Sequence, residues 1–355
     1  LLKSLSKSCV QSLRAKLGHI ALPGYELIAS ALKQCSIDRL SGICGTPADQ
    51  IFSAAEKQGL RILGFRRQDA AVLASASDNY SSRRLAHAVL VSAGPAITNT
   101  CTGVLFAQAN HLPVLLLGTR RSLIDEGSGY FQEFDAVPMM KPLTKFAATV
   151  RHASDLIPMI SEAMRIAISD EPGPVFLDIP ENVIAEEAAL TRISIPQRTS
   201  LEPEDHDAHA ALELLRSAQR PLICIGEGVH WESDAMAIRN LIEREQIPFI
   251  TTALARGYIP ESHPLCVTSS KKDALLYADV ILMAGAWFDW RFRMGAELNQ
   301  EAKIIHAHEN TAELGRNINC HLEVRSDPGK FLNRISAFPT EPTKSSNWLK
   351  HLPRN

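Results

Sequence analysis

The sequence lacks several features that would define a class of protein at once. It has no run of about 18 apolar residues, so no helix that crosses a membrane is expected. Its 37 Lys and Arg face 39 Asp and Glu, and this near-neutral balance argues against nucleic acid as a partner bound through bulk charge. None of the 7 cysteines is spaced C-x-x-C, so a reducing compartment fits better than a disulfide framework or a structural zinc site.

Common catalytic motifs are also missing. The chain contains no G-x-S-x-G, H-E-x-x-H or Walker loop, and no Ser or Cys stands in a local nucleophile motif. The chain has two close histidine pairs, His206 with His209 and His306 with His308. The first pair lies in a polar stretch, and the rings of the second pair need not project the same way from their strand. No metal site is predicted.

What the sequence does have is a regular alternation of apolar strands and helices. A length of 355 residues predicts two domains. In the first half, strands are expected at 39–45, 60–65, 87–92, 112–118 and 173–180, and helices at 47–59, 68–77, 104–110 and 155–169. Near-continuous apolar strands that alternate with helices predict a parallel sheet covered on both faces.

The same pattern restarts after a polar stretch. Helices are expected at 207–219 and 233–245, and strands at 221–226, 247–252, 279–285 and 303–308, with the segment KKDALLY at 271–277 before the third of these strands. The fold prediction is α/β, with two successive three-layer α/β/α domains and mainly parallel sheets. The predicted parts are a segment at 1–24, a domain at 25–185, a linker at 186–206, a second domain at 207–338 and a tail at 339–355.

The first twenty residues are basic, rich in Ser, free of acids and amphipathic at helical spacing. This combination is typical of a mitochondrial transit peptide, which predicts a mitochondrial location, with the cytoplasm otherwise. An ordinary surface helix, or a helix that docks on an acidic partner, fits the same residues. The chain does not begin with Met, which is consistent with a start inside a longer precursor.

Three turns of the first domain are candidate ligand sites, because ligands of doubly wound sheets lie outside the carboxyl ends of the strands. These turns are 41–47, 64–71 and 92–99. In the second domain, GEGVH at 226–230 begins like a dinucleotide loop but lacks its third glycine. The alternative for each turn is structural, since glycine at a strand–helix turn is often required by backbone geometry alone.

Taken in order, the segments 45–77, 92–99, 129–135, 141–146 and 171–180 resemble the pyrimidine-binding domain of thiamine-diphosphate enzymes of the acetolactate synthase-like superfamily. The segments 220–229, 247–265, 278–295 and 303–317 resemble the central domain of 2-hydroxyacyl-CoA lyases and oxalyl-CoA decarboxylases. The resemblance covers about residues 25–335.

The resemblance implies a Glu that hydrogen-bonds the aminopyrimidine ring of the cofactor and promotes loss of the thiazolium proton. At that position this chain has Gln68. An amide can hold a ring nitrogen but cannot exchange its proton, and loss of a positioned acid or base costs about 10²–10⁴ in rate. Asp69 is a poor substitute, because one residue along a helix turns about 100° away.

Three further departures concern binding. Ala96 replaces the second glycine of the family's Ser-Gly-Pro-Gly turn, and Trp287 replaces an Arg that would suit the phosphates of CoA or ADP. The family's third domain binds diphosphate and Mg²⁺ through Gly-Asp-Gly, which occurs nowhere in this chain. No cofactor is therefore expected for this chain alone, and thiamine diphosphate with Mg²⁺ only if a partner supplies that domain.

The resemblance thus marks two sets of vestigial positions and no catalytic residue. The cofactor-binding positions are Gly45, Pro47, Gln68, Gly94, Pro95, Asn99 and Gln132, and the nucleotide-binding positions are Gly226, Gly228 and Gly285. The predicted function is a non-catalytic homologue that serves as a structural or interaction subunit, in a homo-oligomer or a hetero-complex. The alternatives are one half of a split lyase or decarboxylase, and a small-ligand binder that uses the second domain.

Overall fold

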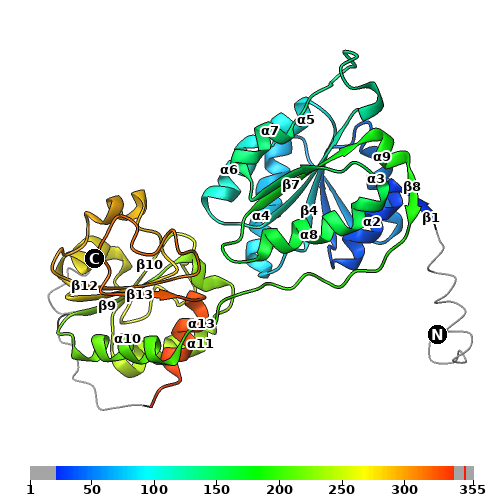
Figure 1. The fold of residues 1–355 in the computed structure, drawn as a ribbon. Helices are drawn as coiled ribbons and strands as arrows, with labels where there is room; N and C mark the ends of the chain where they lie inside the picture. The colour runs from blue at the N-terminus through cyan, green and yellow to red at the C-terminus, as the bar shows by residue number, and fades with distance from the viewer. Residues whose placement is uncertain (1–20, 340–347, 349–355) are drawn as a thin grey trace, which may run out of the picture. The chain divides into compact units, whose positions relative to one another are not determined.

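A computed structural model describes residues 21–339 and residue 348 (Figure 1). The chain divides between Thr199 and Ser200 into two compact units, and this division falls inside the segment predicted as a linker. The mitochondrial prediction concerns residues 1–20, which lie outside the described residues, as does most of the predicted tail. Within the described part, every helix is too short or too polar to span a bilayer.

The first unit is built on a six-stranded sheet in which all neighbours are parallel. The strand order is β3-β2-β4-β5-β7-β6, with β2 (Arg39–Gly42), β3 (Arg61–Gly64), β4 (His87–Val91), β5 (Val114–Arg120), β6 (Phe146–Thr149) and β7 (Pro174–Pro180). Strand order reverses between β2 and β4, which makes their carboxyl ends the switch point where ligands of such sheets bind.

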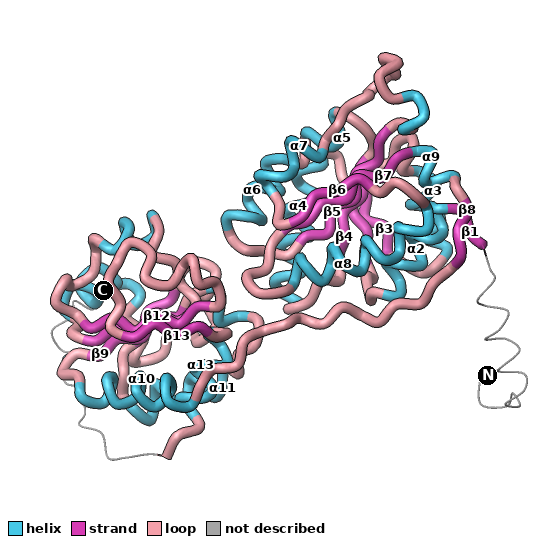
Figure 2. The backbone as a smooth tube through the Cα atoms, in the orientation of Figure 1, coloured by secondary structure: helices cyan, strands magenta, loops and turns pink. Residues whose placement is uncertain are grey.

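Helices cover both faces of this sheet (Figure 2). One face carries α2 (Gly24–Gln34), α3 (Asp49–Lys57) and α8 (Leu156–Ile168), and the other α4 (Gln68–Ser82) and α6 (Cys101–Ala109). In α8 the buried positions recur at one, three and four residues, which places a single apolar stripe against the sheet: Leu156, Ile157, Ile160, Ala163, Met164 and Ala167. Shorter helices are α5 (Pro95–Thr98), α7 (Val137–Met140), α9 (Glu181–Ala185), η2 (Leu123–Asp125), η3 (Lys141–Leu143) and η4 (Ala153–Asp155).

A separate two-stranded antiparallel ribbon joins the beginning and the end of the first unit. It pairs β1 (Ala21–Pro23) with β8 (Glu187–Ala189). The strand β8 was not predicted, because three residues with two small alanines carry too little pattern to be recognised.

The second unit has a five-stranded parallel sheet in the order β10-β9-β11-β12-β13. Its strands are β9 (Pro221–Ile225), β10 (Phe249–Thr251), β11 (Val280–Ala284), β12 (Lys303–His308) and β13 (Leu322–Arg325). One face packs on α10 (Asp205–Ser217), α11 (Ala235–Glu245) and α13 (Pro328–Ser336); the other packs on α12 (Lys271–Tyr277), on η7 (Trp290–Gly295) and on Trp348. The remaining turns are η5 (Glu227–His230) and η6 (Thr268–Ser270). The predicted fold class is confirmed.

Candidate functional site

The turns after β2, β3 and β4 meet at the switch point of the first sheet, and residues 92–99 contact all the others. Gly45 packs against Ser92, and a Cβ added at Gly45 would lie 3.1 Å from the Ser92 hydroxyl oxygen. Pro47 follows Gly45 through a cis peptide bond with Thr46. The fold therefore brings turns far apart in the sequence to one edge.

Gln68 is the first residue of α4, at that same edge. Its side-chain oxygen accepts a hydrogen bond of 3.3 Å from the amide of Asn99, which follows the short helix α5. Two side chains that the resemblance assigns to the cofactor are thus in contact. Both end in amides, so this pair can donate and accept hydrogen bonds but cannot take up or release a proton at neutral pH.

The neighbouring acid Asp69 does not replace the missing carboxylate. Its oxygens accept hydrogen bonds of 3.0 and 2.7 Å from the Arg67 guanidinium and one of 2.9 Å from the amide of Ala70. These bonds, led by the one from Arg67, hold the pKa of Asp69 below its usual range. A carboxylate held ionised beside an arginine is a poor proton donor.

Gly94 and Gln132 lie on the other side of the candidate ligand face, by which we mean the surface where the turns after β2, β3 and β4 meet. Gly94 has φ +58°, which only glycine adopts at low cost, and a Cβ there would lie 3.0 Å from the Cβ of Gln132. Pro95 opens α5 directly after it. Ala96 is 8% exposed, so its methyl group packs into the unit.

The loop that carries Gln132 is held by its own acid. Glu133 accepts hydrogen bonds from the amides of Gly127, Gly129 and Tyr130, the last two at 3.0 and 3.1 Å. These backbone bonds, above all the one from Gly127, lower the pKa of Glu133. The Glu133 carboxylate therefore holds the loop in place through hydrogen bonds from three backbone amides.

In the second unit, the three glycines of the nucleotide prediction touch one another. The amide of Gly228 donates to the carbonyl of Gly285 at 2.9 Å, and a Cβ at Gly226 would lie 2.2 Å from that same carbonyl oxygen. The structure thus gives these glycines a packing role. Trp287 is 4% exposed, so its ring is buried in this unit.

The two histidines of β12 are closer than the sequence analysis expected. The rings of His306 and His308 lie 5.8 Å apart, because residues two apart in a strand project from the same face. The expectation that they need not project the same way is wrong. No group of three possible metal ligands occurs within residues 21–339 or at 348, and the histidines instead contact Phe288 and Trp287.

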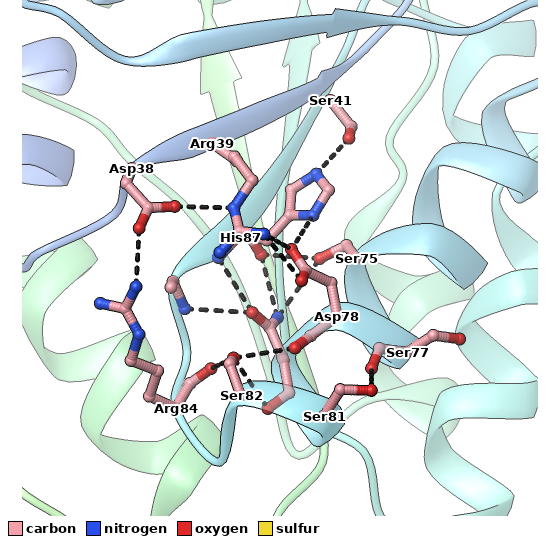
Figure 3. Close-up of polar contacts among 12 residues, drawn as sticks. Asp38, Arg39, Ser41, Ser75, Ser77, Asp78, Ser81, Ser82, Arg84 and His87 are labelled. Carbon is pink, nitrogen blue, oxygen red and sulfur yellow. Dashed lines mark hydrogen bonds and ion pairs between the residues drawn. The ribbon is translucent and has the colours of Figure 1, made fainter.

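One group of three hydrogen-bonded polar residues was not predicted from the sequence. The Ser41 hydroxyl hydrogen-bonds His87 Nε2, and His87 Nδ1 lies 2.9 Å from an Asp78 oxygen (Figure 3). The contacts are those of a Ser-His-Asp triad. Ser41 is completely buried and His87 2% exposed, so no substrate reaches the hydroxyl. The constellation ties β2 and β4 to α4 and is structural.

The fold and the site together define a two-unit α/β protein whose first unit presents a ligand face at its switch point. Residues 23–139 match the thiamine pyrophosphate enzyme N-terminal TPP binding domain, and residues 208–335 match the thiamine pyrophosphate enzyme central domain. The chain therefore belongs to the thiamine pyrophosphate enzyme family, and its N-terminal TPP-binding domain is present.

Curated relatives fall in one part of that family. The chain is 31% identical to 2-hydroxyacyl-CoA lyase 1 of Mus musculus over 340 residues, which are 93% of this chain and 58% of the relative. It is 32% identical to oxalyl-CoA decarboxylase of Escherichia coli (strain K12) over 280 residues, 77% of this chain and 50% of the relative. The chain thus spans about half the length of the relatives it matches.

Proposed function

We propose that this chain is a non-catalytic homologue of thiamine-diphosphate-dependent 2-hydroxyacyl-CoA lyases and acts as a structural or interaction subunit of a larger assembly. The observation that carries the proposal is Gln68, which stands at the start of α4 with its oxygen bonded to Asn99. The acids that follow Gln68 and Gln132 in the sequence already have partners. Asp69 is hydrogen-bonded by Arg67, and Glu133 is hydrogen-bonded by backbone amides.

The face still suits a flat polar ring. Gln68 and Asn99 would hydrogen-bond the nitrogens of an aminopyrimidine, and Gly94 lets the side chain of Gln132 pack closely against its backbone. Thiamine diphosphate, when bound, supplies a thiazolium carbon that attacks carbonyl groups. This chain's own residues would hold and orient the ring. Activation of the thiazolium carbon requires a proton transfer, and the amide of Gln68 can neither release nor take up that proton.

Exposed apolar side chains support the interaction role. The loop between β5 and α7 exposes 82% of Ile124, 53% of Tyr130 and 72% of Phe131, although hydrogen bonds of Glu133 fix its shape. An ordered loop that presents large apolar side chains is typical of a protein–protein contact.

Native mass spectrometry of the full chain at micromolar concentration tests the subunit role. We expect a homo-oligomer or a complex with a co-purifying protein, and a stable monomer would contradict the proposal. The same sample, supplied with thiamine diphosphate, Mg²⁺ and a 2-hydroxyacyl-CoA, tests the loss of catalysis. We expect no cofactor-dependent consumption of the thioester, and consumption by the wild-type chain would contradict it.

The second candidate is one half of a split lyase or decarboxylase, and the close packing of Gln132 against Gly94 at the switch point favours it. Calorimetric titration of thiamine diphosphate and Mg²⁺, with every co-purifying chain present, separates the two candidates. The split enzyme requires saturable heat of binding and thioester cleavage by the same sample. Absence of both would leave only the non-catalytic subunit.

A further inference from the structure

The second unit has a switch point of its own, between the carboxyl ends of β9 and β11. The Gly226–Gly228 turn leaves β9 there, and Gly285 ends β11 beside it. In open α/β sheets this crevice receives the diphosphate of a nucleotide, which is bound by unpaired backbone N–H groups.

Here the N–H groups of the turn are already used. The amide of Gly226 donates to Ala284 O at 2.8 Å, that of Gly228 to Gly285 O at 2.9 Å, and that of Val229 to Gly226 O at 3.2 Å. The two turns are therefore bonded to each other across the crevice. An anion placed between them would have to break these bonds.

A buried carboxylate also occupies the turn. Glu227 is 3% exposed, and one of its oxygens accepts a hydrogen bond of 2.7 Å from the Thr252 hydroxyl. The other oxygen, Oε1, is buried and has no hydrogen-bond partner among the described residues. A negative charge in a site of low dielectric opposes a diphosphate strongly.

The positive charge that faces Glu227 comes from the chain itself. The Nε of Arg291 lies 3.9 Å from Glu227 Oε1, and its guanidinium also bonds the Asp289 carboxylate. The guanidinium carbon lies 5.6 Å from the ring centre of Trp287 and 5.4 Å from that of Trp290. Arginine stacks on indole rings in this way when a flat cation is recognised.

We propose that Arg291 is an internal ligand of this crevice, and that it makes the second unit refuse nucleotide diphosphates, ADP and CoA included. Its guanidinium lies beside Trp287 and Trp290 and faces Glu227, so that a flat cation of the chain itself stands where a doubly wound sheet would otherwise receive an anion. The inference concerns the second unit only and holds whether or not the proposal for the first unit stands.

The first test is direct binding. All four tryptophans (Trp231, Trp287, Trp290 and Trp348) lie in the second unit, so tryptophan fluorescence reports on this crevice. Titration of the wild-type chain with ADP and with CoA, each to about a hundred times the micromolar Kd typical of a nucleotide site, is expected to give no saturable change, with calorimetry as a second readout. Saturable binding of either nucleotide would overturn the proposal.

The second test removes the internal ligand and supplies it again. R291A is expected to lower the midpoint of tryptophan-monitored thermal unfolding, and millimolar methylguanidinium is expected to restore part of the loss. R293A is the matched control, since Arg293 is exposed in the same loop and its variant has no such cavity to fill. Equal effects of methylguanidinium on R291A and R293A, or none on R291A, would overturn the assignment.

R291K keeps the assay informative if R291A fails to fold. Lysine preserves the charge beside Glu227 but not the flat guanidinium between the two indoles. We expect R291K to fold with a lowered midpoint and to show a smaller gain from methylguanidinium than R291A. A wild-type midpoint in R291K would overturn the role of the stacked guanidinium.

Discussion

Arg120 and Asp178 form a buried ion pair that uses only one oxygen of the carboxylate. Arg120, at the end of β5, places its NH1 3.3 Å from Asp178 Oδ2 on β7, and Thr149 donates to the same oxygen at 3.1 Å. Asp178 Oδ1 is buried and has no hydrogen-bond partner in the part of the chain that the structure describes. The guanidinium also bonds Glu126 at 2.8 Å, which connects the sheet to the loop that carries Gln132.

The first prediction concerns the pH response of this pair. Burial raises the pKa of Asp178 to about 6 despite Arg120. A carboxyl with a raised pKa stabilises the fold below its unfolded pKa of about 4, and this stability is lost as pH rises through the folded value. We expect the first unit of the wild type to lose on the order of 3 kcal/mol relative to D178N between about pH 4 and pH 7.

Hydrogen exchange of the β5 and β7 amides measures this difference in the intact chain. D135N is the matched control, because Asp135 also faces Arg120, at 3.9 Å, but is exposed. Its pH profile is expected to follow the wild type. Parallel profiles for the wild type and D178N would contradict the prediction.

The second prediction has the opposite sign and belongs to the second unit. His306 is completely buried, and its Nε2 lies 3.0 Å from Ala286 O. Its Nδ1 has no hydrogen-bond partner within residues 21–339 or at 348. Burial, with a smaller effect of His308, lowers the pKa of His306 to about 4. Its contribution is fully present above the unfolded pKa of about 6.5 and is lost as pH falls toward about 4.

Urea unfolding followed by tryptophan fluorescence reports on this unit alone. We expect a loss on the order of 3 kcal/mol in the wild type between about pH 7 and pH 4, and a smaller loss in H306Q. H321Q changes an exposed histidine of the same unit and is expected to behave like the wild type. An H306Q profile as steep as that of the wild type would refute the assignment.

The third prediction concerns the buried triad. S41A leaves the Nε2 of His87 buried without its hydroxyl donor, and we expect a loss of about 1–3 kcal/mol in the stability of the first unit. S81A removes an exposed hydroxyl and is expected to change stability by less than about 0.5 kcal/mol. Chemical denaturation followed by circular dichroism measures both.

The burial of the triad also predicts how the Ser41 hydroxyl reacts. Because Ser41 is completely buried, we expect a fluorophosphonate probe to leave it unmodified in the folded chain. Peptide mass spectrometry after labelling checks this. Stoichiometric labelling at Ser41 would show that the hydroxyl is reachable and that the structural interpretation is wrong.

The fourth prediction concerns the Gly94 turn. G94A forces a side chain into φ +58° and within 3.0 Å of Gln132, so we expect a loss of about 1–3 kcal/mol in the stability of the first unit. G64A is the matched control, because Gly64 ends a neighbouring strand and a Cβ there meets nothing within 4 Å. Equal losses for G94A and G64A would count against a special role of Gly94.

The fold was predictable because buried parallel strands are apolar runs that alternate with helices. The expected helix 155–169 is α8 (Leu156–Ile168), and the expected strand 173–180 is β7 (Pro174–Pro180). The strands β6 and β13 were not predicted, because four residues carry little periodicity. The edge strands β3 and β10 are equally short but were predicted, because each lies inside a longer apolar run, at 60–65 and 247–252.

The candidate site was predictable only as a set of turns. Motif order led to Gly94, Asn99 and Gln132, but contacts between residues far apart in the chain were not visible in it. Ser41 and His87 are separated by 46 residues, and Glu227 reaches Thr252 across 25. Such pairs follow from strand order, which is a property of the whole sheet.

The β1–β8 ribbon has a mechanical consequence. Ala21 pairs with Ala189 and Pro23 with Glu187, so the segment that enters the first unit and the segment that leaves it emerge side by side at one end of the ribbon. Tension between them would peel three residue pairs apart one after another. The ribbon is therefore expected to separate under a pulling force before the six-stranded sheet, whose strands carry the ligand face, is disrupted.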